Sequence, residues 1–157
     1  MFMGDLILKY FSDLPTQNDF VERNDFSPPA ELDKILDLEK VLGIKLPNDY
    51  IDFLLITNGY SGKLGQSNVH FIGIEKIEEY TLAYGGEFFP WIVFIGTDGG
   101  NEMYVIDKRN EKLQFGLLPY IGEDKDFMLL GDTFEEFIKH LYSNDFWGEI
   151  KTAPNTA

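Results

Sequence analysis

The sequence predicts an α+β fold in one domain, with a mainly antiparallel β-sheet flanked by α-helices. The order of hydrophobic patterns is the first reason, because two helices, a strand, a third helix, several adjacent strands and a closing helix follow one another. Chain length is the second reason, since 157 residues with 44% hydrophobic and 15% aromatic content suffice for one core and not for two. We expect residues 27–150 to form the domain, after a variable, peripheral lead-in at residues 1–26 and before a frayed tail at residues 151–157.

The first helix of the domain is expected to start at Ser27, because a serine followed by two prolines is typical of a helix N-terminus. It should run to about Leu42, with Gly43 as a left-handed stop. One face of this helix is apolar and carries Leu32, Ile35, Leu36 and Leu42. Glu39 lies within this stripe, where an unpaired carboxylate is costly to bury. We therefore interpret Glu39 as an acceptor for backbone amides of a nearby loop, in preference to a buried catalytic acid or ligand.

The second helix is expected to open at Pro47, because proline tolerates the first helical turn, and Tyr50 begins its inward face. The other inward positions are Phe53, Leu54 and Thr57. Gly59 ends the helix, because glycine adopts the positive φ that stops a helix. Residues 60–66 contain Gly62 and Gly65 and are predicted to form a loop.

Strands dominate the second half of the predicted fold. The pattern changes at His70, where a strand should begin and lead into a helix that Gly85 and Gly86 end. Residues 91–95 and 103–106 are apolar, aromatic and β-branched, and the glycine-rich residues between them predict a hairpin. Two further strands are expected, at residues 113–118 and 127–130.

The closing helix has the clearest local signal in the chain. Asp132 and Glu135 stand at the spacing of a capping box. The apolar positions that follow have helical periodicity: Phe134, Phe137, Ile138 and Leu141. We therefore expect an amphipathic helix to close the domain.

The charge of the chain limits its partners. There are 27 acidic residues against 13 lysines and arginines, which gives a formal net charge of -14. A phosphate-coated partner would be repelled, so direct binding of nucleic acid is excluded. The excess of seven acids in residues 1–80 equals that in residues 81–157, so the negative field belongs to the folded surface and not to an acidic tail. This surface either keeps the protein soluble or takes part in binding.

Other classes are excluded by what the sequence lacks. Without cysteine it has no disulfide, thiolate zinc site, iron–sulfur ligation or cysteine nucleophile. No apolar run approaches the roughly 20 residues of a membrane span, and no leader peptide is recognisable. We expect a soluble cytoplasmic protein that does not bind membranes.

No constellation for catalysis or metal binding is found in the sequence. His70 and His140 are the only imidazoles, and neither has a neighbouring serine in a recognisable nucleophile motif. Asp98, Asn101 and Glu102 offer oxygen ligands on one turn, but without the alternating spacing of a calcium loop. We therefore predict no catalytic residue, no cofactor and no metal.

Several motifs together resemble one known family. The first half of the chain contains Leu38-Glu39, Leu42-Gly43, Leu46-Pro47-Asn48-Asp49-Tyr50, Phe53-Leu54 and Asn58-Gly59. The second half contains a strand with Trp91, the turn sequence Ile95-Gly96-Thr97-Asp98-Gly99-Gly100, then Ile106-Asp107 and Phe134-Glu135-Glu136-Phe137. In order and spacing these motifs resemble the SUKH superfamily over residues 27–142. This superfamily includes yeast cell-wall synthesis regulators of the Smi/Knr type and many small bacterial immunity partners of polymorphic toxins.

The resemblance implies a fold of the Smi/Knr type and a non-enzymatic protein that binds and neutralises a toxin. It also implies that the matched residues are mostly structural: Glu39, Gly43, Pro47, Tyr50, Gly59 and Trp91. A nuclease toxin must be basic to hold phosphates, so an acidic surface suits such a partner. Two alternatives stay open: a regulatory or scaffold module related to the cell-wall regulators, and a small carboxylate enzyme with a metal at Asp98 and Glu102.

Partner-binding residues are sought where exposed acids stand beside exposed rings, because aromatic anchors supply binding energy and charges guide the approach. Three segments have this composition. The candidates are Tyr60 in the glycine-rich segment, Glu87 and Phe88 after Gly86, and Asp98 and Glu102 at the hairpin turn.

Overall fold

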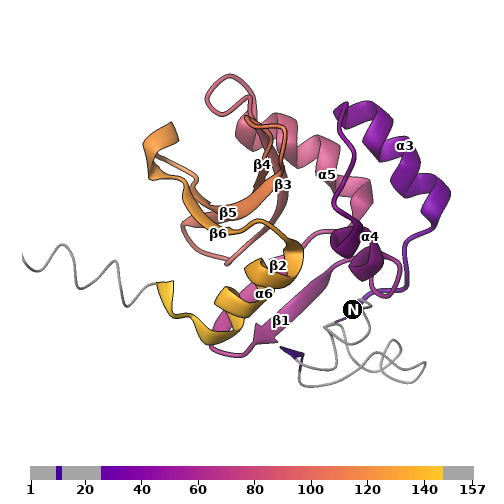
Figure 1. Cartoon of the computed structure of the whole chain (residues 1–157), viewed down its shortest axis with the longest axis horizontal. Helices are drawn as coiled ribbons and strands as arrows, with labels where there is room; N and C mark the ends of the chain where they lie inside the picture. The colour runs from indigo at the N-terminus through magenta and orange to yellow at the C-terminus, as the bar shows by residue number, and fades with distance from the viewer. Residues whose placement is uncertain (1–9, 12–25, 147–157) are drawn as a thin grey trace, which may run out of the picture.

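The fold is built on one six-stranded antiparallel sheet in which the strands follow their chain order, a simple meander (Figure 1). The computed structural model describes residues 10–11 and 26–146. The strands are β1 (Tyr60–Leu64), β2 (Ser67–Phe71), β3 (Ile92–Thr97), β4 (Glu102–Asp107), β5 (Gln114–Pro119) and β6 (Met128–Gly131). The predicted α+β class with an antiparallel sheet is therefore confirmed.

Four α-helices accompany the sheet in the described part of the chain. They are α3 (Leu32–Leu42), α4 (Asn48–Leu54), α5 (Ile74–Tyr80) and α6 (Phe134–Ser143). A π-helical turn, η1 (Thr81–Gly85), continues α5, and a 3-10 turn, η2 (Asp124–Asp126), precedes β6. Figure 1 shows the curved strands β3–β6 on one side of the molecule and α3 with α4 on the other. No helix within the described ranges is long and apolar enough to cross a bilayer.

Apolar side chains leave both faces of the central strands, because successive residues of a strand point to opposite sides. The larger core joins one face to the helices, and Phe134 of α6 packs there with its ring centre 5.1 Å from Tyr50 and 5.0 Å from Phe53. A smaller cluster occupies the opposite face and contains Phe89, Trp91, Ile92, Phe94, Met103, Val105 and Leu118. The sheet is therefore covered on both sides.

The first helix begins later than predicted, at Leu32. Ser27 is not its cap, because its amide donates to the Thr57 hydroxyl at 2.9 Å, and the amide of Ala30 donates to the Leu54 carbonyl at 2.9 Å. The residue before a proline also avoids helical angles, so this segment runs extended along α4. The buried face differs too: Ile35 and Leu38 are buried, whereas Leu32 and Leu36 are 51% and 43% exposed.

The prediction of a loop at residues 60–66 is wrong. Residues 60–64 form β1, which pairs with β2 in a register that joins Tyr60 to Phe71 and Leu64 to Ser67. Both Tyr60 and Leu64 are buried. Gly65 has φ +58 and makes the tight turn, so β2 begins at Ser67 and not at His70. Glycines that suggested a loop therefore belong to a hairpin.

Part of the expected lead-in is not peripheral. Tyr10, Phe11 and Phe26 are each less than 9% exposed and belong to the larger core. The ring of Phe11 lies 4.8 Å from that of Tyr60, and Phe26 forms an isolated β-bridge with Tyr60. The remainder of residues 1–26 and the expected tail at residues 151–157 lie outside the described residues.

The closing helix is confirmed, but its cap is shifted by one residue from the prediction. The amide of Glu136 donates to the Thr133 hydroxyl at 3.1 Å, and the amide of Asp132 donates to the Glu136 carboxylate at 2.9 Å. Thr133 is thus the N-cap, because α6 begins at Phe134, and the Glu136 carboxylate accepts from the residue before the cap and not from the cap itself. Asp132 instead accepts hydrogen bonds from Lys112 and Gln114.

Candidate functional site

Two residues of the family motif hold the loop between α3 and α4. The backbone amide of Leu46 donates to the Glu39 carboxylate at 2.7 Å, which confirms Glu39 as a structural acceptor. Gly43 has φ +70 and its amide donates to the Glu39 carbonyl, so it is the left-handed end of α3. These contacts hold the loop that joins the two helices.

Three further motif residues also support the core. Pro47 is the N-cap of α4, and Tyr50 is 1% exposed, with burial raising the pKa of its hydroxyl. Gly59 has φ +106, and a Cβ atom there would lie 2.5 Å from the Phe71 carbonyl oxygen. Only glycine fits this close approach between the end of the helical layer and β2.

Trp91 anchors a network of charges that sequence reasoning missed. Its indole nitrogen donates to the Asp124 carboxylate at 2.9 Å, which ties η2 to the start of β3. The guanidinium carbon of Arg109 lies 3.6 Å from the centre of the Trp91 ring. Arg109 also donates through Nε and Nη2 to the buried carboxylate of Asp107, at 3.0 and 2.9 Å. Guanidinium groups bind both aromatic faces and carboxylates, and this site uses both modes.

The turn between β3 and β4 positions two of the predicted partner-binding acids. One carboxylate oxygen of Asp98 accepts from the amide of Gly100 at 2.7 Å and from that of Glu102 at 3.2 Å. The hydroxyl of Thr97 donates to the Glu102 carbonyl at 2.8 Å. Asp98 therefore shapes the turn and brings its own charge close to that of Glu102.

Asp126 completes a group that we call the acidic corner, formed by Asp98, Glu102 and Asp126. Glu102 is half-buried, and its pKa is raised first by burial and then by the negative charges of Asp98 and Asp126. Among the described residues, no ion pair includes any of the three carboxylates. Like charges therefore accumulate here, and no described ion pair offsets them.

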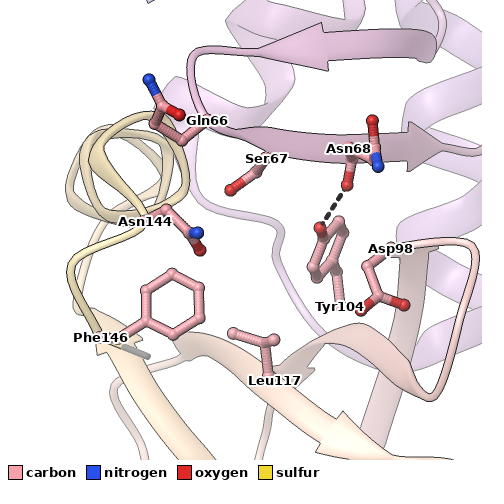
Figure 2. Close-up of a pocket in the computed structure, with 8 residues that line it drawn as sticks. All are labelled: Gln66, Ser67, Asn68, Asp98, Tyr104, Leu117, Asn144 and Phe146. Carbon is pink, nitrogen blue, oxygen red and sulfur yellow. Dashed lines mark hydrogen bonds between the residues drawn. The ribbon is translucent and has the colours of Figure 1, made fainter. Parts of the chain in front are cut away.

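A small polar pocket adjoins the acidic corner, and Figure 2 shows Asp98 beside Tyr104 on one wall and Asn144 with Phe146 on the opposite side. Its volume is about 150 Å³. The Tyr104 hydroxyl donates to the Asn68 carbonyl at 2.9 Å, and its pKa is raised by burial and then by Asp98 and Glu102. In the described part of the chain every buried side-chain nitrogen and oxygen has a hydrogen-bond partner. No buried polar side-chain atom of the pocket lining is therefore left without a partner.

Three tyrosines form what we call the tyrosine face: the exposed Tyr84 and the half-buried Tyr80 and Tyr120. Tyr84 is 44% exposed, and its ring centre lies 5.1 Å from that of Tyr120 and 5.8 Å from that of Tyr80. All three rings also pack on Phe94 of β3. Sequence reasoning did not single out this face, although the spacing of four residues between Tyr80 and Tyr84 already placed these two on one side of a helix.

The five predicted partner-binding residues do not form one surface. Asp98 and Glu102 come together, whereas Phe88, 83% exposed, and Glu87 precede the opposite end of β3. Tyr60 is not an exposed ring, because it is 4% exposed and its hydroxyl donates to the Lys63 carbonyl. The expectation for Tyr60 is therefore wrong.

Chemical groups other than carboxylates are sparse. Within the described residues no cluster of three or more His, Cys, Asp or Glu side chains could hold a metal ion. The strand pairing places Ser61 opposite His70, with Nδ1 3.3 Å from the hydroxyl oxygen, a proximity that sequence reasoning missed. His140 bonds Asp145 at 2.9 Å and lowers the pKa of that carboxyl. Both histidines lie on the surface, and the His70 ring lies against Gly99, in the turn that carries Asp98.

The fold defines the class of protein: a small α+β domain with a six-stranded meander and a helix that closes its larger core. Residues 29–140 match the SMI1 / KNR4 family (SUKH-1), and the chain belongs to this family. It is also 34% identical over 123 residues to the uncharacterized protein YnaB of Bacillus subtilis (strain 168), which covers 75% of this chain and 80% of that protein. The predicted family is thus confirmed.

Proposed function

We propose that this chain is an immunity protein that binds a cognate toxin and neutralises it. Membership of the SUKH-1 family supports a role in binding another protein, since immunity proteins of toxins are the bacterial members expected from the resemblance. The observation that carries the proposal is the acidic corner, where the Glu102 amide donates to Asp98 and no ion pair among the described residues includes any of the three carboxylates. A surface of this kind is electrostatically unfavourable alone and becomes favourable against a positively charged partner.

The partner is proposed to be a basic nuclease. A nuclease attracts phosphates with lysines and arginines, so its active surface is the part of it most strongly drawn to a chain of net charge -14. Binding there would both speed association and block access of nucleic acid. The acidic chain acts as a competitor for the phosphate-binding surface and needs no catalytic group.

Growth rescue tests the proposal directly. The toxin encoded beside this gene is expressed alone and then together with this protein, and we expect growth only in the second case. A truncated chain that lacks α6, and with it much of the larger core, is the control and should not rescue. Continued growth arrest with every neighbouring toxin would contradict the immunity function.

Charge reversal in the acidic corner tests the electrostatic part. In Asp98→Lys/Glu102→Lys the local charge changes by four units, and each unit at about 10 Å in water is worth about 0.4 kcal/mol against one partner charge. At about 0.01 M salt, where the screening length is about 30 Å, roughly 1.2 kcal/mol remains, or about an eightfold slower association. Asp33→Lys/Asp37→Lys on α3 has the same net charge and is the matched control.

Stopped-flow measurement of association decides between the two variants. The corner variant should lose most of the faster association that the unchanged protein has at low salt. The difference in association rate between the two proteins should vanish at about 1 M salt, where the screening length is about 3 Å. Equal slowing by the α3 control would show that total charge, and not the corner, guides the approach.

A further inference from the structure

The tyrosine face and the acidic corner lie next to each other and differ in what they offer a ligand. The first presents aromatic rings, and the second presents negative charge. We propose that together they form one docking surface for an arginine-bearing segment of a basic protein partner, an inference that rests on the proposed function and names its binding site.

The ring of Tyr84 is exposed and is nevertheless fixed by its contacts. The ring of Tyr84 stacks on Phe94 with centres 5.3 Å apart and an angle of 28° between the planes. The turn that carries Tyr84 is fixed to the sheet, because the amide of Phe94 donates to the Thr81 hydroxyl at 2.9 Å. This turn is π-helical, a rare geometry that is frequent at functional sites. A preorganised ring loses little freedom on binding and is suited to be an anchor.

Tyr120 connects the tyrosine face to the acidic corner, because its ring centre lies 5.1 Å from that of Tyr84. Tyr120 is half-buried, and its backbone amide donates to the carbonyl of Asn101, in the hairpin turn that carries Asp98, at 3.0 Å. Apolar surface therefore continues from the π-helical turn to the edge of the acidic corner, as in interfaces with an aromatic centre and a charged rim.

The charge of the corner reaches the rings. The pKa of Tyr120 is raised, mainly by burial, and the charge of Asp98 contributes. A guanidinium group placed between ring and carboxylate would stack on the first and donate hydrogen bonds to the second. The chain itself contains this arrangement, since Arg109 lies on Trp91 while it binds Asp107. The proposed site has the ring and the carboxylates and lacks only the arginine.

A second copy of the chain is a poor source of that arginine. Arg23 and Arg109 are the only arginines in the sequence, and Arg109 already binds Asp107 and Trp91. Two copies would also bring together two strongly negative surfaces. Charge complementarity therefore favours a foreign, basic partner over self-association.

Tyr84→Ala tests the surface in the complex with the toxin that the rescue assay identifies. Tyr142, 42% exposed on α6, supplies the matched control Tyr142→Ala. Titration calorimetry should show at least about tenfold weaker binding for the first variant and a change within about twofold for the second. Unchanged affinity of Tyr84→Ala, or equal losses in both variants, would overturn the proposal while leaving the immunity function standing.

A second experiment does not depend on the toxin. An oligo-arginine peptide is titrated into the full-length protein, and backbone amide shifts are followed by NMR, with an oligo-lysine peptide for comparison. We expect the largest shifts at Tyr84, Tyr120 and Glu102, a larger response to arginine than to lysine, and loss of the response in Glu102→Gln. Shifts spread evenly over acidic surfaces such as α3, or no preference for arginine, would overturn the docking surface. Failure of the toxin to be neutralised would instead contradict the proposed function.

Discussion

Arg109 offers a prediction in which the structure sets the magnitude. The Asp107 side chain is 4% exposed and accepts three N–H groups, all from Arg109: the backbone amide at 2.9 Å, Nε at 3.0 Å and Nη2 at 2.9 Å. The guanidinium also lies 3.6 Å from the centre of Trp91. Arg109→Ala removes two of the three donors and leaves a buried carboxylate with one.

The size of the effect follows from these contacts. Removing one partner of a fully buried ion pair costs about 3–5 kcal/mol. The Arg109 side chain is 38% exposed, so solvent screens part of this, and the lost contact with Trp91 adds about 0.5–1 kcal/mol. We expect a loss of about 2–3 kcal/mol in the free energy of unfolding, or a fall of about 5–10 °C in the melting temperature for a chain of this size.

Urea denaturation measures this loss, with Lys112→Ala as the control. Lys112 also forms an ion pair, with Asp132, but the two side chains are 68% and 42% exposed, so its removal should cost at most about 0.5 kcal/mol. Asp107→Asn combined with Arg109→Ala should recover much of the loss, because no buried charge then remains unpaired. An Arg109→Ala cost as small as that of Lys112→Ala, or one unchanged in the double variant, would refute the reasoning.

Two other changes test the acidic corner and the close approach of Gly59 to β2. A raised pKa of Glu102 means that the folded state holds its proton more tightly, so this group makes the stability fall as the pH rises above the usual pKa of 4.5. Glu102→Gln should remove that fall and stabilise the protein at neutral pH, as measured by urea titration. Equal pH profiles for both proteins would contradict the interpretation. Gly59→Ala should lower the free energy of unfolding by about 2–4 kcal/mol, because at φ +106 the new Cβ atom would meet the Phe71 carbonyl oxygen. Gly43→Ala, with open space around it, should cost about 1 kcal/mol. Similar losses at both positions would count against the steric argument.

Features with local signals could be predicted from the sequence. Glycine-rich residues between two apolar runs indicate the turn at Asp98, and the order of the motifs indicates the family before any contact is known. Glu39 could also be interpreted, since a carboxylate inside an apolar stripe must find donors, and it finds the amide of Leu46. At the turn and at Glu39 the physical constraint acts within about ten residues.

Tyr60 shows where such reasoning fails. The glycines around it suggest a loop, yet its ring is buried by Phe11 and Phe26, which precede it by tens of residues. Burial of this kind depends on contacts between distant segments, which overrides local propensity. The shifted start of α3 has a similar cause, because bonds to Leu54 and Thr57 hold residues 27–30 extended.

The candidate site was predictable only in part. Asp98 and Glu102 share a turn, so their proximity could be expected from sequence. Tyr84 and Tyr120 are separated by the whole β3–β4–β5 meander, and only the fold brings their rings to 5.1 Å. Sequence alone therefore indicated the charges of the surface and missed the rings beside them.

Inhibition of the purified toxin is the measurement that tests the central claim most directly. Nuclease activity of the toxin encoded beside this gene is followed while the protein is added. We expect activity to fall to the background level at one equivalent of protein, and to need a larger excess when Asp98 and Glu102 are replaced by lysine. A toxin that remains fully active in the presence of excess protein would contradict the account.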